Sequence, residues 1–314
     1  MKKIFKYPKT ILVIFLTTAS VLIWYQAGTL SKNCGENLCP LKIAFLNIGQ
    51  GDSIFIETPH GNQILIDGGP SGKVLQELGK QMSFFDNSID MIIVTNPDKD
   101  HIGGFLDVLK RFDVSAEIEP GTVSSTAVYK EFTKKIAQEG AKKIIAQRGM
   151  DFLLDTDVHL LILFPDKDVS TFSTNDGSIV AKLVYKNTSV MLTGDAPEKT
   201  EKYLDALETR DFAFSATSST TSATSTTSTL ANIAHLKSDI LKVGHHGSKS
   251  ATSQEFLENV LPSYAVISAG KNNSYGHPSP EVTDRLTKNK IPILGTYAEG
   301  TIVFESDGER WVRK

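Results

Sequence analysis

A dense group of potential metal ligands follows an apolar run that ends at Val94. Residues 95–104 read TNPDKDHIGG and contain Asp98, Asp100 and His101 within four positions. Carboxylates and imidazoles are the usual protein ligands of divalent metals. The stretch therefore predicts part of a metal site at the end of a buried strand, and it also contains Asn96, a neutral amide.

Four further polar clusters border apolar runs elsewhere in the chain. They are Asp67 after Ile64-Leu65-Ile66, Asn175-Asp176-Gly177-Ser178 before Ile179, Asp195 after Val190-Met191-Leu192-Thr193-Gly194, and His245-His246 after Ile240-Leu241-Lys242-Val243-Gly244. Because strand ends of one sheet lie side by side, such loops can converge on one site. The pattern predicts a metal site assembled from distant segments.

The adjacent histidines His245 and His246 raise a question of geometry. Successive side chains of an extended backbone point to opposite faces. We therefore expect one imidazole to be a ligand and the other a hydrogen-bonding neighbour, and the sequence leaves open which is which.

The elements that must position these residues alternate between strands and helices from Leu41 onward. Apolar runs between glycine and asparagine turns predict an antiparallel meander at 42–48, 52–57 and 63–67. Further strands are predicted at 158–164, 179–185, 189–193, 240–243, 265–268, 293–295 and 301–306. Helical spacing predicts helices at 74–80, 105–111, 127–140, 198–207, 254–260 and 280–288. This mixture favours an α/β sandwich with sheets inside and helices outside.

Residues 215–229 (SATSSTTSATSTTST) interrupt this pattern. They have no apolar surface to offset the entropy lost on ordering, so we expect a disordered surface loop. An insertion in one domain over residues 41–314 is favoured over a linker between two domains, because the motifs on both sides belong to one set.

The N-terminal 40 residues differ from the rest. Four lysines precede Thr10–Leu30, a stretch of 21 residues without a charge. This length can span a bilayer, and the lysines predict a cytoplasmic N-terminus with the remainder outside. Residues 1–30 are thus expected to be an uncleaved membrane anchor, since no A-x-A site favours a cleaved signal peptide. Residues 31–40 form a linker, in which Cys34 and Cys39 can pair outside the cytoplasm.

Composition limits the remaining possibilities. The chain has 314 residues, 40% of them hydrophobic and 22% charged, which fits a globular core. The net charge of −3 excludes a global basic surface, so nucleic-acid binding would need a local patch.

The order of the motifs resembles the metallo-β-lactamase fold. The series consists of Ile-Asp-Gly-Gly, a D-x-D-H cluster followed by Ile-Gly-Gly, Leu-Thr-Gly-Asp and Gly-His-His-Gly-Ser. The stretches 45–53, 242–248 and 275–282 are similar to the extracytoplasmic hydrolase domain of the ComEC competence proteins, which internalise DNA. The resemblance covers residues 41–310 and implies a four-layer αββα metallo-β-lactamase sandwich.

The resemblance also implies a set of metal ligands. The family pattern H-x-H-x-D-H reads Asn96-x-Asp98-x-Asp100-His101 here. One ion would be held by Asp100, His101, Asp195 and either His245 or His246. Asp98, Asp195 and the Asn96 oxygen would form the other site. An oxygen-rich shell of this kind shifts the preference from zinc toward manganese or magnesium. The expected cofactor for the site as a whole is one or two divalent ions, manganese or zinc.

Supporting roles follow for other residues. Asp67 is expected to support the cluster by hydrogen bonds, and Ser178 stands where the family has a histidine. Asp100 would also orient the attacking water. The resemblance places His277 near the site, where it could protonate a leaving group or bind phosphate. Ser248 could contact the substrate.

These features predict a membrane-anchored extracytoplasmic hydrolase that acts on a phosphodiester. Single- or double-stranded DNA is one candidate substrate, and a wall polymer or nucleotide is another. One apolar segment cannot form a DNA channel, so a separate uptake channel would be a partner. The alternatives are a degenerate binding module with a structural metal or none, which Asn96 keeps open, and hydrolysis of a β-lactam or thioester.

Overall fold

The computed structural model describes residues 39–218 and 236–314, with only the backbone for 209–218. The expected anchor at residues 1–30, nearly all of the linker and Cys34 lie outside these ranges, as does His235. Within the described ranges, none of the helices is both long and apolar enough to cross a membrane.

The first of two sheets has eight strands. Their order is β15 (Trp311–Arg313), β14 (Ile302–Ser306), β1 (Leu41–Phe45), β2 (Ile54–Glu57), β3 (Gln63–Ile66), β4 (Ser88–Ile93), β5 (Asp113–Glu119) and β6 (Lys142–Ile145). Pairing is antiparallel from β15 to β3 and parallel from β3 to β6. The antiparallel β1–β2–β3 meander confirms the prediction for residues 42–67.

The second sheet has seven strands. Their order is β13 (Ile293–Gly295), β12 (Tyr264–Ile267), β11 (Ile240–Lys242), β10 (Thr188–Leu192), β9 (Val180–Tyr185), β8 (Val158–Phe164) and β7 (Asp151–Asp155). Pairing is antiparallel from β7 to β10 and parallel from β10 to β13. Both sheets therefore change from antiparallel to parallel pairing near their middle.

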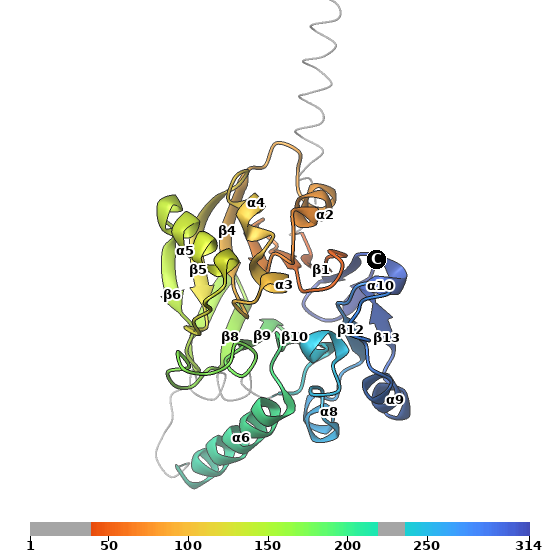
Figure 1. Ribbon diagram of the computed structural model, residues 1–314. Helices are drawn as coiled ribbons and strands as arrows, with labels where there is room; N and C mark the ends of the chain where they lie inside the picture. Colours follow the sequence, from red (N-terminus) through yellow and green to blue (C-terminus); the bar gives the residue numbers. More distant parts are fainter. Residues whose placement is uncertain (1–38, 219–235) are drawn as a thin grey trace, which may run out of the picture. The chain divides into compact units, whose positions relative to one another are not determined.

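Helices cover the outer face of each sheet (Figure 1). Those beside the first sheet are α2 (Lys73–Gln81), α3 (Lys99–Ile102), α4 (Phe105–Val108) and α5 (Ala127–Glu139). Those that follow strands of the second sheet are α6 (Glu198–Ser218), the 3₁₀ turn η1 (Gly244–Gly247), α8 (Gln254–Val260), α9 (Pro280–Lys288) and α10 (Thr296–Glu299).

Three apolar cores hold these layers together, because alternate side chains of a strand point to opposite faces. In β1, Ile43 and Phe45 belong to the core between the two sheets. Ala44 and the following Leu46 belong to the core beneath α2–α5. A third core packs the second sheet against α6, α8 and α9, and it includes Leu204, Phe256 and Val282. The predicted αββα sandwich is thereby confirmed.

Several predicted boundaries need correction. The strand at 158–164 and the helices at 254–260 and 280–288 match the structure, whereas the helix predicted at 105–111 ends at Val108. Strands β5, β6, β7 and β15 were not predicted. Residues 215–218, predicted to be disordered, are the end of α6. A helix that has been nucleated gains one hydrogen bond for each added residue, so weak helix formers can extend it. The rest of the Ser/Thr-rich segment, from residue 219, lies outside the described ranges.

Strand β5 was not predicted although apolar and polar residues alternate along it, because one of its polar positions is buried. Its polar position Glu117 is 1% exposed, and neither carboxylate oxygen has a hydrogen-bond partner. Burial, aided by the nearby charge of Glu119 and opposed by Lys143, raises the pKa of Glu117 to about 7. Ionised Glu117 is therefore unfavourable in the folded state.

This burial predicts a pH-dependent stability. The folded-state pKa of Glu117 exceeds the ordinary value of 4.5, so its contribution to stability is retained below pH 4.5 and lost as pH rises through about 7. Glu117→Gln removes the ionisation. We expect the variant to be more stable than the parent at pH 8 by about 1–3 kcal/mol, and the difference to vanish near pH 4.5.

Urea unfolding followed by circular dichroism at both pH values measures this difference. The exposed Asp113→Asn on the same strand is the matched control and should change stability little at either pH. Equal stability of Glu117→Gln and the parent at pH 8 would contradict the prediction.

Candidate metal centre

The candidate ligands lie where parallel strands end. Asp67 follows β3 and the 96–101 cluster follows β4, while Asp195 follows β10 and the two histidines follow β11. β3–β4 and β10–β11 are neighbouring parallel pairs at the middle of their sheets. The carboxyl ends of such strands are the usual place for a site in an open α/β sheet. Both sheets thus contribute to one cluster.

Glycines in two motifs allow the Asp67 and His101 loops to touch. The Gly104 amide donates to the Gly69 carbonyl at 2.8 Å, and the Gly68 amide donates to the His101 carbonyl at 2.5 Å. A Cβ on Gly104 would lie 1.9 Å from the Gly68 oxygen. Any larger residue at 104 would therefore separate the loops that bring Asp67 to His101.

Four side chains from three loops converge closely enough to bind one ion. Asp100, His101, Asp195 and His246 each offer a ligand atom, and all four atoms lie within 4.8 Å of one another. The Asp195 Oδ2 atom is 3.1 Å from His101 Nε2 and 3.5 Å from His246 Nε2. His246 Nε2 is also 3.3 Å from Asp100 Oδ2. The resemblance implied Asp100, His101, Asp195 and either His245 or His246 around one ion. In the structure, His246 is the histidine that belongs to this four-residue group.

A buried carboxylate orients the first imidazole. His101 is fully buried, and its Nδ1 lies 2.8 Å from Asp67 Oδ2. The Thr95 amide and hydroxyl hold Asp67 in turn, at 2.8 and 2.6 Å. Since Nδ1 is engaged with Asp67, the other nitrogen, Nε2, faces Asp195. Asp67 also has a φ of 56°, an unfavourable backbone angle for a non-glycine residue.

A second buried carboxylate serves His246 in the same way. Asp52 Oδ1 lies 3.3 Å from His246 Nδ1, which also approaches the Ser268 carbonyl at 3.1 Å. The Lys242 ammonium makes an ion pair with Asp52 and donates to the Gly194 carbonyl at 2.9 Å. Lys242 is 1% exposed. It therefore binds both the carboxylate behind His246 and the backbone beside Asp195.

Sequence reasoning overlooked Asp52 and Lys242. Asp52 was assigned only to the start of a predicted strand at 52–57, and Lys242 to the apolar run before His245. The available signal was a single lysine inside the buried strand Ile240-Leu241-Lys242-Val243, since lysine is almost never fully buried without a partner.

Electrostatics follow from this crowding of charges. Burial opposes ionisation of Asp195, but His246, His101 and Lys242 outweigh it and hold the pKa of Asp195 well below its ordinary value. Burial likewise opposes protonation of His101, yet Asp195 and Asp67 raise its pKa well above 6.5. Without a metal, the cluster thus favours protonated imidazoles between carboxylates. A metal ion would displace those protons, because it binds the neutral ring.

The backbone at the adjacent histidines differs from the expectation. His245 and His246 have φ values of 48° and 57°, so the premise of an extended backbone is wrong. The tight left-handed turn lets both rings approach Asp195, with His245 Nε2 at 3.8 Å from its Oδ2. His246 is buried, whereas the His245 side chain is 26% exposed. Both imidazoles consequently lie at the site.

Asn96 and Asp98 make hydrogen bonds within the protein instead of joining the four-residue cluster. The Asn96 oxygen accepts from the Asp98 amide at 2.9 Å, and its nitrogen donates to Asn175 Oδ1 at 2.7 Å. Asp98 Oδ2 accepts from the Thr174 hydroxyl at 2.8 Å, and burial raises the Asp98 pKa. The expected roles of Asn96 and Asp98 as ligands remain predictions.

The remaining predicted residues occupy different places. His277 lies beside the cluster, with its ring centroid 5.7 Å from that of His245, and its buried Nδ1 has no hydrogen-bond partner. Ser248 contacts Ser250, whose hydroxyl is 3.3 Å from His245 Nδ1. Ser178 turns back to the Thr174 carbonyl at 3.4 Å. Of these three, His277 is in direct ring contact with the cluster.

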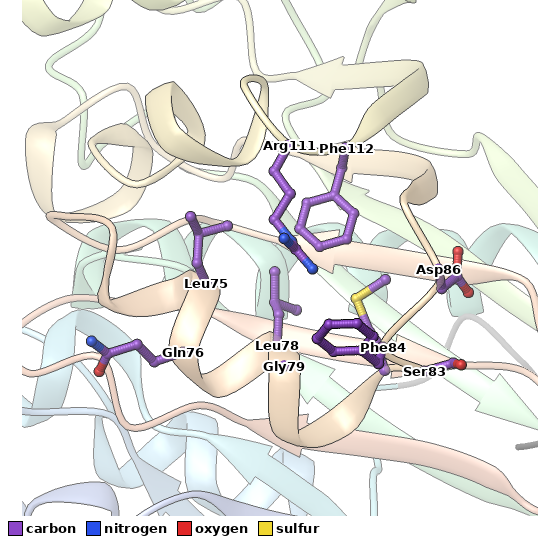
Figure 2. Close-up of a pocket in the computed structure, with 10 residues that line it drawn as sticks. Leu75, Gln76, Leu78, Gly79, Ser83, Phe84, Asp86, Arg111 and Phe112 are labelled. Carbon is purple, nitrogen blue, oxygen red and sulfur yellow. The ribbon is translucent and has the colours of Figure 1, made fainter. Parts of the chain in front are cut away.

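A pocket on another part of the domain does not involve these residues. It lies beside α2, and Figure 2 shows Leu75, Leu78, Phe84 and Phe112 around it with Arg111 at one side. None of the candidate ligands lines it. Its lining is mostly apolar and contains no histidine.

Comparisons with known proteins agree with this arrangement. The metallo-beta-lactamase superfamily profile matches residues 46–271. The chain is 30% identical over 280 residues to ComE operon protein 3 of Bacillus subtilis, covering 84% of this chain and 33% of that protein. Recombination protein 2 of Haemophilus influenzae is 29% identical, with 82% and 28% covered. Competence protein ComA of Neisseria gonorrhoeae is 26% identical, with 82% and 31% covered.

These matches confirm the predicted resemblance to the competence proteins. The chain spans about a third of the length of the curated relatives that it matches. The similarity therefore concerns one part of those proteins.

The Asp67–His101 pair predicts a measurable effect on metal affinity. In Asp67→Asn, one of the two acceptor oxygens becomes an NH₂ group, which would face either the Thr95 amide or both the Thr95 hydroxyl and His101 Nδ1, so the side chain can no longer accept all three hydrogen bonds. Loss of such a supporting partner weakens metal binding by about 10–100-fold. Competition titrations with Mn²⁺ and Zn²⁺ would measure this, with Asp113→Asn as the control that should bind like the parent. Unchanged affinity in a folded Asp67→Asn variant would show that Asp67 does not support a metal ligand.

Proposed function

This chain belongs to the metallo-beta-lactamase superfamily, and we propose that it is a metal-dependent phosphodiesterase acting on nucleic acid. The observation that carries the proposal is the convergence of Asp100, His101, Asp195 and His246 from loops of both sheets. Asp100 has a 34% exposed side chain, whereas the other three are buried. A substrate can therefore reach the cluster from the side of Asp100.

The residues fit a divalent ion on their unsatisfied atoms. His101 Nε2, His246 Nε2 and Asp195 Oδ1 are buried without hydrogen-bond partners. Burying such atoms unpaired is costly, and a cation removes the cost. Two imidazoles and two carboxylates suit manganese or zinc.

The chemistry combines the ion with neighbouring protein groups. A bound divalent ion would polarise a phosphoryl oxygen and favour attack by water near neutral pH. His277 is the proposed residue that would supply a proton to the leaving oxygen or bind phosphate, and its ring contacts with His245 and His246 beside the candidate ligands support this role. Burial and the nearby His245 and His246 lower the His277 pKa, so its protonated ring is a stronger acid but is less populated near neutral pH.

Nucleic acid is the proposed substrate because one relative is named as a competence protein and the chain resembles the ComEC hydrolase domain. We propose that the uncharged Thr10–Leu30 segment anchors the domain outside the cytoplasm, where it would serve a separate DNA-uptake channel. The anchor, the channel and the DNA substrate are parts of the proposal.

A second candidate function is favoured by Asn96. Its amide oxygen and nitrogen are both used in hydrogen bonds to other protein groups. A site that has lost one ligand can keep a structural ion without turnover. The alternative is therefore a binding module of the same fold.

Removal of single ligands separates these functions. We expect Asp195→Ala and His101→Ala to reduce hydrolysis of bis-p-nitrophenyl phosphate and of a DNA oligonucleotide by more than about 100-fold, because each loses a ligand that supporting groups alone cannot replace. Activity is measured for the full chain with Mn²⁺ and with Zn²⁺, alongside metal content.

Asp113→Asn serves as the matched carboxylate control and should retain parental activity. A parent chain that binds metal but hydrolyses neither substrate with either ion would favour the binding module. Turnover of a β-lactam or thioester without turnover of phosphodiesters would assign the site to acyl chemistry instead.

A further inference from the structure

We infer that Tyr275 is a stacking platform for a nucleobase and that the site takes single-stranded nucleic acid or unpaired ends. This inference rests on the proposed function and names its substrate class. It depends on the rings beside the cluster and on the loop that presents Tyr275.

A row of rings leads from the ligand cluster to the surface. The His277 ring centroid lies 6.5 Å from that of His246 and 5.9 Å from that of Tyr275. The Tyr275 and His277 rings are stacked, with 26° between their planes. Tyr275 is 69% exposed, so much of its ring surface is open to solvent. The order of ligand cluster, bridging ring and exposed aromatic corresponds to the phosphate, sugar and base of a nucleotide.

The loop that carries Tyr275 is held in place by one side chain. The Asn273 oxygen accepts from the amides of Tyr275 and His277, both at 3.1 Å. The Asn273 nitrogen donates to the carbonyls of Gly270 and His277. Gly276, with a φ of 71°, permits the turn that stacks the rings on either side of it. Tyr275 is therefore exposed on a fixed backbone.

Single exposed aromatic side chains are common on protein surfaces, so it is the position of Tyr275, stacked on His277 beside the candidate ligands, that indicates a role in binding. Base stacking on an aromatic side chain is such a role, and it tolerates any base sequence. The neighbouring Lys271 in the same loop is exposed and adds positive charge for a phosphate backbone. These are the two components of sites that bind single strands.

The same geometry disfavours an intact duplex. Bases inside a duplex are stacked on each other, and presenting one to a protein ring requires unpairing it. Unpaired ends and single strands do not carry this cost. We therefore expect single strands to bind more tightly than a blunt duplex of the same sequence.

Oligonucleotides that either retain or lack the bases at their central positions provide the test. The substrates are a single-stranded DNA, the same strand with abasic positions throughout its centre, and the blunt duplex. Binding is measured by fluorescence anisotropy with the full-length His101→Ala variant, which should cleave the strands very slowly. Turnover in Mn²⁺ is measured with the full-length chain that retains His101. We expect about 5–100-fold weaker binding of the abasic strand, the range given by base stacking.

Variants of Tyr275 then test whether this side chain is the one on which the base stacks. Tyr275→Ala should bind the normal strand as weakly as the abasic one and leave the abasic strand unaffected, whereas Tyr275→Phe should retain the parental preference. Phe84→Ala is the matched control, since Phe84 is another exposed aromatic, at 79%, that lines a pocket without candidate ligands. It should change neither affinity.

The outcomes also separate this inference from the function on which it rests. Base preference in binding without any hydrolysis would overturn the phosphodiesterase proposal and support the stacking platform. Equal binding of normal and abasic strands would overturn the platform. If Tyr275→Ala slowed cleavage of normal and abasic strands equally, with affinities unchanged, Tyr275 would only position His277 and the inference would be wrong.

Discussion

The structure depends on the cost of burying three carboxylates at one point between two sheets. Asp52, Asp67 and Asp195 are at most 3% exposed, and Asp100 stands beside them at the rim. Ionised carboxylates leave water only when cations and hydrogen bonds replace it. The negative charge of each carboxylate is balanced by a different partner, and these partners determine which atoms are left free to bind a metal ion.

Three kinds of partner provide this compensation. Lys242 makes an ion pair with Asp52, and Thr95 donates two hydrogen bonds to Asp67. The imidazoles of His101 and His246 each lie between a supporting carboxylate and Asp195. Their Nε2 atoms are left without hydrogen-bond partners, which makes them suited to bind a metal ion.

The sandwich makes such a cluster possible because its strands are rigid and its loops approach closely. Apolar cores on both faces of each sheet fix the strand ends. Gly68 and Gly104 then bring two loops into backbone contact. Strain accompanies this arrangement, since Asp67, His245 and His246 all have positive φ angles. The packing of the layers stabilises backbone angles that these residues rarely adopt alone.

The sequence by itself determined the layered α/β class and most strand and helix positions, because these follow from local apolar periodicity. The apolar strands before their motifs predicted that several loops can converge on one site, and the resemblance to the metallo-β-lactamase fold implied that Asp100, His101 and Asp195 share an ion there. Only the tertiary structure decided that His246 joins them, that Asp52 and Lys242 lie behind it, and that Asn96 bonds to Asn175. Strand β5 escaped prediction because Glu117 counts as polar locally yet is buried by distant segments. The reason is physical: periodicity reflects a residue's neighbours in the chain, whereas burial and ion pairing depend on contacts between segments far apart in it.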